Sequence, residues 1–181
     1  RRVALACGGA AGSLGQMTLP RLAPVLAAIL CFLESVAPGA ESVGSKPAKT
    51  VRLLTVGNSF SQNATRQLGN LVTNAGHMLI HQPIVVGGAS LELHWSRAAS
   101  HEKDPQSTNG LYANKQSLKQ MLAAQPWDFV TIQQASLKSH DVTTYRPYAP
   151  KLVAHLKSLR PCAEVVLHQT WAYRVDADKL G

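Results

Sequence analysis

Short runs of apolar residues recur along this chain, and each one gives way to glycine or to polar residues. The first run, Val51–Val56, is rich in branched side chains and stops at Gly57, which is typical of a buried parallel strand. Three later runs have the same character, at Ile80–Val86, Phe129–Ile132 and Glu164–Leu167. The pattern therefore predicts four strands.

Residues with helical spacing lie between these runs. Helices are predicted over 62–75 and 148–159, and Leu118, Met121 and Leu122 mark a shorter one. The apolar face expected of the first helix is Ala64, Leu68, Leu71 and Val72. Strand and helix alternate throughout, so the predicted fold class is α/β, a three-layer α/β/α sandwich with a mostly parallel central sheet.

The first forty residues differ in composition from the rest of the chain. An apolar stretch over 22–33 follows Arg21, and mostly small residues fill 35–40, a layout typical of a signal peptide. A buried N-terminal helix is the alternative. The expected segments are 1–16, an over-called start; 17–40, a signal peptide; 41–50, a linker; and 51–181, the folded domain. We therefore expect an exported protein, periplasmic or extracellular, without a stable membrane anchor after leader removal.

The amino-acid composition limits the kinds of molecule that the protein is expected to bind. The chain is 45% hydrophobic and 15% charged, as in ordinary globular proteins. Its formal net charge is +8, but the lysines and arginines are scattered singly, so we expect no nucleic-acid binding. An anionic polymer such as an acidic polysaccharide is left open as a partner. Neither cysteine nor histidine spacing predicts a metal site, and no cofactor is expected.

Four loops follow the predicted strands, and all are rich in Ser, Gln, His and Gly. Their sequences are Gly57-Asn-Ser-Phe-Ser61, Gly87-Gly-Ala-Ser-Leu-Glu-Leu-His94, Gln133-Gln-Ala-Ser136 and His168-Gln-Thr-Trp171. The carboxyl ends of parallel strands meet at one edge of a sheet, so these loops should lie together. Such residue types supply nucleophiles, bases and oxyanion donors.

These loops resemble the SGNH (GDSL) hydrolases from Val51 to about Tyr173, in particular a poorly characterised bacterial branch with Gly-Asn-Ser where Gly-Asp-Ser is usual. The resemblance implies an SGNH or flavodoxin-like fold in which Ser59 is the nucleophile. It also implies an oxyanion hole formed by the backbone N–H groups of Ser59 and Gly88 and by a side-chain amide. Gln134, or its neighbour Gln133, stands where the family usually has Asn.

The chemistry of acyl transfer explains why these residue types belong together. A serine hydroxyl is a weak nucleophile, so it needs a base, and the charge developing on the substrate oxygen needs several donors. Asn58 is short and polar enough to fix the loop through local hydrogen bonds. The remaining residues expected to line a pocket are Glu92, His94, His168 and Trp171. Taken singly, each motif also suits an ordinary turn, cap or backbone contact.

The family's Asp-x-x-His motif, which supplies the base and its orienting carboxylate, is missing from this sequence. We expect these residues to lie beyond Gly181, in which case the chain is a fragment. His94, His140 and His168 are the other candidates for the base, although no orienting carboxylate is placed by the sequence.

Two functions are consistent with these motifs. The first is a secreted serine esterase or acyl hydrolase, acting on small-molecule or carbohydrate esters through an acyl-enzyme on Ser59. The second is a non-catalytic module that binds carbohydrate or another ligand on the same scaffold and lacks the catalytic histidine. Turnover that depends on Ser59 distinguishes them.

Overall fold

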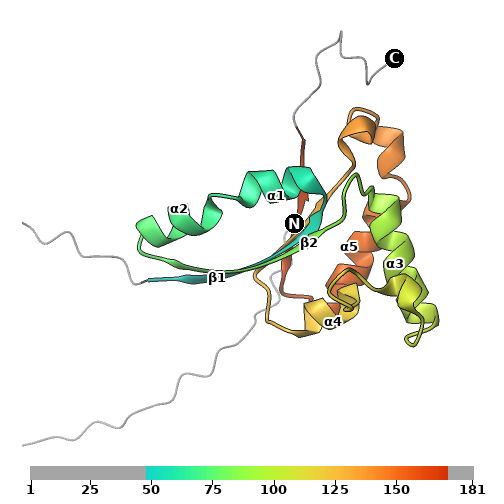
Figure 1. The fold of residues 1–181 in the computed structure, drawn as a ribbon, viewed down its shortest axis with the longest axis horizontal. Coiled ribbons are helices and arrows are strands. Elements are labelled where there is room, and N and C mark those ends of the chain that lie inside the picture. Colours follow the sequence, from blue (N-terminus) through green and yellow to red (C-terminus); the bar gives the residue numbers. More distant parts are fainter. Residues whose placement is uncertain (1–47, 171–181) are drawn as a thin grey trace, which may run out of the picture. The chain divides into compact units, whose positions relative to one another are not determined.

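The structure is a computed structural model, and it describes residues 48–170 of the 181-residue chain (Figure 1). The predicted leader and most of the predicted linker lie outside the described residues, as does Trp171.

Four strands form one parallel sheet in the order β2-β1-β3-β4. They are β1 (Thr50–Gly57), β2 (Met78–Val85), β3 (Phe129–Gln133) and β4 (Glu164–His168). All four predicted strands are confirmed, with ends that differ by two residues at most. The central strands β1 and β3 alternate between two buried faces, which explains why their sequences are almost continuously apolar.

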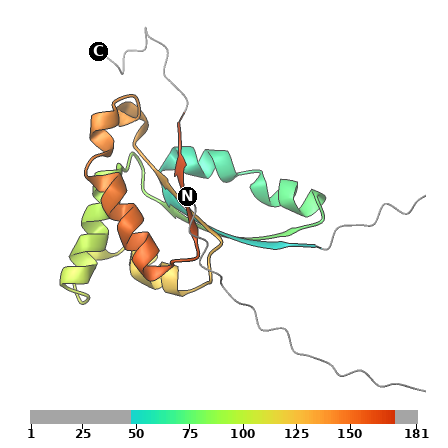
Figure 2. The ribbon, with the colours of Figure 1, turned by 180° about the vertical axis from the view of Figure 1, so that it is seen from behind.

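Helices cover both faces of this sheet, as the two opposite views show (Figures 1 and 2). On one face lie α1 (Ser59–Thr65) and α2 (Leu68–Asn74); on the other lie α3 (Leu91–Lys103), α4 (Leu118–Ala123) and α5 (Tyr148–Leu159). Three short 3-10 helices complete the described part, at Thr108–Gly110, Ser136–Lys138 and Val142–Tyr145. The predicted α/β/α class is confirmed. No helix within residues 48–170 has the length and apolar character that crossing a membrane requires.

The first helical segment differs from the prediction of one helix over 62–75. It begins earlier, at Ser59, and breaks between Thr65 and Leu68 into α1 and α2. The Thr65 hydroxyl donates to the backbone carbonyl of Ser61 at 2.9 Å, a local contact that competes with regular helix geometry. The face expected to be apolar and buried is only partly covered, and Leu71 is 64% exposed.

Helix α3 is absent from the predicted elements, because its buried face is not apolar. The side chains that it buries are Leu91, His94, Ala98 and His101. Their spacing is helical, but two of the four are histidines, which conceals the hydrophobic pattern. Ser90 caps the helix by accepting from the backbone N–H of Leu93 at 3.3 Å. The loop predicted over 87–94 is therefore a short turn followed by a helix.

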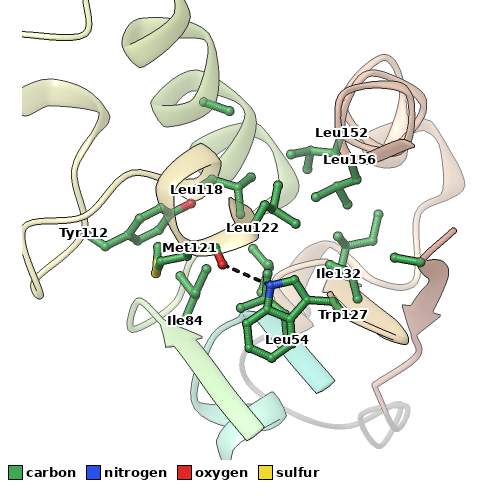
Figure 3. Packing of buried hydrophobic residues seen from close by; sticks show 14 of the residues in the cluster. Leu54, Ile84, Tyr112, Leu118, Met121, Leu122, Trp127, Ile132, Leu152 and Leu156 are labelled. Carbon is green, nitrogen blue, oxygen red and sulfur yellow. Dashed lines mark hydrogen bonds between the residues drawn. The ribbon is translucent and has the colours of Figure 1, made fainter. Parts of the chain in front are cut away.

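The main hydrophobic core fills the space between the sheet and the layer of α3, α4 and α5 (Figure 3). Leu54 and Ile132 from the sheet face Leu122 and Leu152 from the helices, and all four are at most 1% exposed. Trp127 closes one end of this core, and its indole N–H donates to the backbone carbonyl of Met121 at 3.0 Å. This packing fixes the strand ends on which the candidate site is built.

Candidate active site

Ser59 lies at the topological switch point of the sheet, where successive connections run to opposite sides of β1. Strand β1 has β2 on one side and β3 on the other, so the connections that follow β1 and β3 diverge and leave a crevice at their carboxyl ends. Ser59 is the first residue of α1, two residues after the end of β1, and it is exposed. The serine expected to be the nucleophile is therefore accessible at the position where α/β folds bind ligands.

The turn that carries Ser59 is held by its buried neighbour Asn58, which is 1% exposed. The side-chain oxygen of Asn58 accepts from the backbone N–H of Phe60 at 3.0 Å and so caps α1. The side-chain nitrogen donates to the backbone carbonyl of Ala89 at 3.0 Å. The hydroxyl of Ser61 donates to the Asn58 carbonyl at 2.8 Å. Asn58 thus joins the loop after β1 to the loop after β2.

A small pocket of about 80 Å³ opens beside Ser59. It is formed by the ends of three strands: the turn after β1, the turn after β2 and the turn after β3. The residues that line it are Asn58, Ser59, Phe60, Gly88, Ala135, Ser136 and Leu137. The structure therefore brings Ser59, Asn58 and Gly88 together, as the sequence predicts that these loops meet.

Gly88 occupies a turn that suits a glycine. The turn is closed by the backbone N–H of Ala89, which donates to the carbonyl of Val86 at 3.1 Å. Gly88 has a φ of 65°, in the left-handed region that glycine adopts without strain. This conformation brings the Gly88 backbone to the pocket wall.

The two glutamines at the end of β3 are buried and do not line the pocket. Gln134, the favoured amide donor, uses all its hydrogen-bonding groups elsewhere. Its side-chain oxygen accepts from the backbone N–H groups of Leu91 (3.1 Å) and Ala135 (2.9 Å), and its nitrogen donates to the carbonyl (2.9 Å) and hydroxyl (3.2 Å) of Thr144. Gln134 therefore connects elements around the site, and it has no N–H left to donate to a substrate.

Gln133 is fully buried beneath the Ser59 turn. Its side-chain oxygen accepts from the backbone N–H of Asn58 at 3.3 Å, and its side-chain nitrogen has no hydrogen-bond partner within residues 48–170. Close packing is possible because residue 57 is a glycine: a Cβ there would lie 2.8 Å from the Gln133 oxygen and 2.7 Å from the Ser61 hydroxyl. Gln133 thus supports the turn from below.

His94 lies in the core beneath the same turn and has no exposed surface. Its Nδ1 is 3.0 Å from the Tyr112 hydroxyl, the two rings stack, and Arg97 lies over the Tyr112 ring. Burial lowers the pKa of His94 to about 4, and the adjacent backbone of Gly57 opposes this shift only in part. A buried, neutral imidazole is a structural group, so His94 does not line the pocket.

The other predicted pocket residues lie apart from Ser59. Glu92 is exposed on α3, where its carboxylate accepts from the Tyr148 hydroxyl at 2.7 Å. His168 ends β4 beside Gln133, and partial burial lowers its pKa. His140 is exposed and lines a separate cavity with Tyr145. As far as the structure describes the chain, neither a histidine nor a carboxylate lines the Ser59 pocket.

Ala135 and Ser136 of the third wall belong to a loop that the sequence predicts at the site, but neither was predicted as a site residue, and Leu137 lies just beyond that loop. Ala135, Ser136 and Leu137 line the pocket directly, whereas the glutamines before them do not. The useful signal was the end of β3: Gln133 is its last residue and Gln134 turns inward, so the first side chains able to reach the crevice follow them. Over the described ranges of the chain, no cluster of three acidic, histidine or cysteine side chains could hold a metal ion.

The fold and this pocket define an α/β/α sandwich protein with an exposed serine at the topological switch point of a parallel sheet. The chain belongs to the DUF4886 family, described as a domain of unknown function, over residues 52–181. No curated protein matches it.

Two solved structures are similar to the chain. One is the 1.50 Å crystal structure of a DUF4886 family protein from Bacteroides uniformis ATCC 8492, with 32% identity and a TM-score of 0.61. The match covers 71% of this chain and 53% of that one, so this chain spans about half the length of that relative. The other, from Slackia heliotrinireducens, is described as "a putative SGNH hydrolase", with 27% identity, a TM-score of 0.49 and coverage of 72% and 62%.

Proposed function

We propose that this protein is a serine-dependent acyl hydrolase of the SGNH type that cleaves carboxylic esters through an acyl-enzyme on Ser59. The observation that carries the proposal is the pocket in which exposed Ser59 and Gly88 lie together, although they are 29 positions apart in the sequence. A serine alone at a turn is common; a serine sharing a pocket with a left-handed glycine from the next strand end is more specific.

The walls of the pocket suit the charge that ester cleavage creates. When the Ser59 hydroxyl attacks an ester carbonyl, the carbonyl oxygen becomes negative and needs preorganised donors. As the first residue of α1, Ser59 has a backbone N–H that no helical carbonyl can accept. The Gly88 turn brings a second backbone segment to the pocket, and Ser136 is the polar residue of the third wall. In the proposed oxyanion hole, the backbone N–H groups of Ser59 and Gly88 therefore act without the Gln134 amide.

The proposed reaction also requires a base to take the proton of Ser59. The side chains that line the pocket within residues 48–170 do not provide one. All seven histidines of the chain lie within residues 48–170, and none of them lines this pocket. His94 is excluded from this role because it is buried and bonded to Tyr112.

A ligand-binding module is the second candidate, and the same observation favours it. A pocket without a histidine can hold a ligand but cannot activate the serine. In that case Ser59 and Gly88 would contribute hydrogen bonds to a bound carbohydrate or ester, and no turnover would occur.

Substitution of Ser59 in the full-length protein separates the two functions. We expect Ser59→Ala to abolish hydrolysis of an activated acetyl ester, by at least about 1,000-fold in kcat, because the nucleophile is removed. Ser96→Ala is the matched control, since Ser96 is exposed on α3 and its hydroxyl bonds only within its own helix. Equal turnover by the wild type and Ser59→Ala would rule out the esterase.

The substrate class and the location of the protein are further parts of this proposal. The pocket is small, which suits a short acyl group such as acetyl. The signal-peptide pattern of the leader suggests an exported protein that meets carbohydrate esters outside the cytoplasm. Release of acetate from acetylated polysaccharides, measured against the polysaccharide after chemical deacetylation, tests this assignment.

A further inference from the structure

We propose that Asn58 is a positioning residue, whose side-chain N–H holds the Gly88 loop against the turn that carries Ser59. This inference rests on the proposed function for its catalytic consequence, but the contact itself lies in the fold. The two loops follow different strands, and the pocket exists only where they meet.

The oxygen and the nitrogen of the Asn58 side-chain amide form different hydrogen bonds. The oxygen caps α1 by accepting from Phe60, a task that Asp would perform equally well. The nitrogen donates to the carbonyl of Ala89 at 3.0 Å, a task that requires a donor. An aspartate at this position would direct a second oxygen at the Ala89 carbonyl, in a site that is 1% exposed.

This contact explains the departure of the chain from the usual Gly-Asp-Ser. The capping half of the side chain is common to Asn and Asp, so the cap does not select between them. The Ala89 carbonyl does, because a buried carboxylate facing a carbonyl oxygen would be desolvated and repelled. In this chain the amide is therefore the required group.

The position of Ala89 explains why the contact matters for the site. Ala89 is buried and follows Gly88 directly, and its N–H closes the Gly88 turn onto Val86. On the other side, the N–H of Leu91 is fixed by Gln134. The Asn58 contact lies between these two attachments and joins Ala89 to the Ser59 turn, whereas the backbone bond from the Val86 N–H to the Gly57 carbonyl, at 3.0 Å, holds only the start of the loop. Its loss would free Gly88 relative to Ser59 while leaving α1 and α3 capped.

The test is the isosteric change Asn58→Asp, with Asn70→Asp as the matched control. Asn70 is exposed on α2, and its amide bonds only to Gln67. Asn58→Ser is a second variant that keeps a good capping residue and removes the amide. Hydrogen exchange, followed by mass spectrometry, reports on the loop without requiring activity.

We expect Asn58→Asp and Asn58→Ser to speed amide exchange over residues 86–91 by about tenfold, while exchange over α1 stays unchanged. In the proposed esterase, kcat should fall by about tenfold or more, with KM within about threefold, because the oxyanion donors are displaced and the ground-state contacts are not. Asn70→Asp should change neither.

The outcomes distinguish this inference from the proposed function. If amide exchange over residues 86–91 is unchanged in both Asn58 variants, the inference that Asn58 holds this loop is wrong, regardless of the effect on activity. Faster exchange with an unchanged kcat overturns the positioning role. Faster exchange in a protein whose wild type shows no Ser59-dependent turnover supports the contact and counts against the esterase alone.

Discussion

Three buried polar side chains around the Ser59 turn each form a hydrogen bond with a backbone group. Gln133 accepts from the N–H of Asn58, Asn58 donates to the carbonyl of Ala89, and the Ser61 hydroxyl donates to the Asn58 carbonyl. Buried polar groups are stable only when they are paired, so these contacts determine the turn more strictly than apolar packing would. We therefore expect single-atom changes at these residues to disturb the turn that carries Ser59.

Gly57→Ala tests how closely this turn is packed. The added Cβ would lie 2.7 Å from the Ser61 hydroxyl and 2.8 Å from the Gln133 oxygen, and both side chains are buried. We expect the free energy of unfolding to fall by about 1–3 kcal/mol, as is usual for overpacking. Urea unfolding measures the change. Gly87→Ala is the control, because its Cβ would meet no atom within 4 Å; a loss equal to that of Gly57→Ala would contradict this account.

His94 should make the stability of the fold depend on pH. Its pKa is lowered from 6.5 to about 4, so the folded state favours the neutral ring. The contribution is fully present above about pH 6.5 and is lost as the pH falls towards 4, amounting to about 3 kcal/mol. His81, His155 and His168 are shifted in the same direction by partial burial and add to the slope.

His94→Gln isolates this contribution, since glutamine does not titrate. Urea unfolding between pH 4 and 7 should show a slope smaller than that of the wild type by up to about 1.4 kcal/mol per pH unit. His140→Gln removes an exposed ring and is the control. Parallel pH profiles for the wild type and His94→Gln would mean that the ring is not buried in its neutral form.

At the scale of elements, the sequence predicted the central strands β1 and β3 well because they are largely buried on both faces. Val51–Val56 and Phe129–Ile132 are largely apolar, without the strict alternation of a half-exposed strand, and such short runs favour a central strand. Helix α3 was not predicted because its buried positions include the polar side chains of His94 and His101, which hide the apolar pattern of a helix. The break after Thr65 depends on a side-chain contact that no periodicity reveals.

The candidate site was also predicted only in part: its loops were found, but the roles of its glutamines were not. The loops containing Ser59 and Gly88 were located from the ends of their strands, and the structure places both at one pocket. The roles of the glutamines were not predictable, because an amide at a strand end can face either the crevice or the backbone. Gln134 faces the backbone of Leu91 and Thr144, which are distant in sequence.

Gln134→Ala tests the connection between these elements. It would leave the N–H groups of Leu91 and Ala135 and the Thr144 carbonyl without this partner. We expect the free energy of unfolding to fall by about 2–3 kcal/mol, since unpaired buried groups are costly. Gln106→Ala, at an exposed position, should change it by less than about 0.5 kcal/mol. Thermal unfolding of both variants provides the comparison, and equal midpoints would contradict the assigned role.

At the scale of the whole molecule, the sheet order determines where the chemistry can be. In the order β2-β1-β3-β4, the topological switch point lies beside β1, between β1 and β3. Ser59 is the first helical residue after β1. Membership of the DUF4886 family gives this chain a fold and relatives without assigning an activity. The proposed hydrolysis therefore rests on the pocket, and the reactivity of Ser59 is its decisive property.

Covalent labelling of the full-length protein is the most direct test of that reactivity. A fluorophosphonate forms a stable adduct only with a serine that is activated and accessible, so it reports the nucleophile without knowledge of the natural substrate. Intact-mass measurement followed by peptide mapping identifies the modified residue. We predict one adduct, on the peptide that contains Ser59, and none in Ser59→Ala. An unlabelled wild type, or an adduct on another serine, would contradict the assignment of Ser59 as the nucleophile.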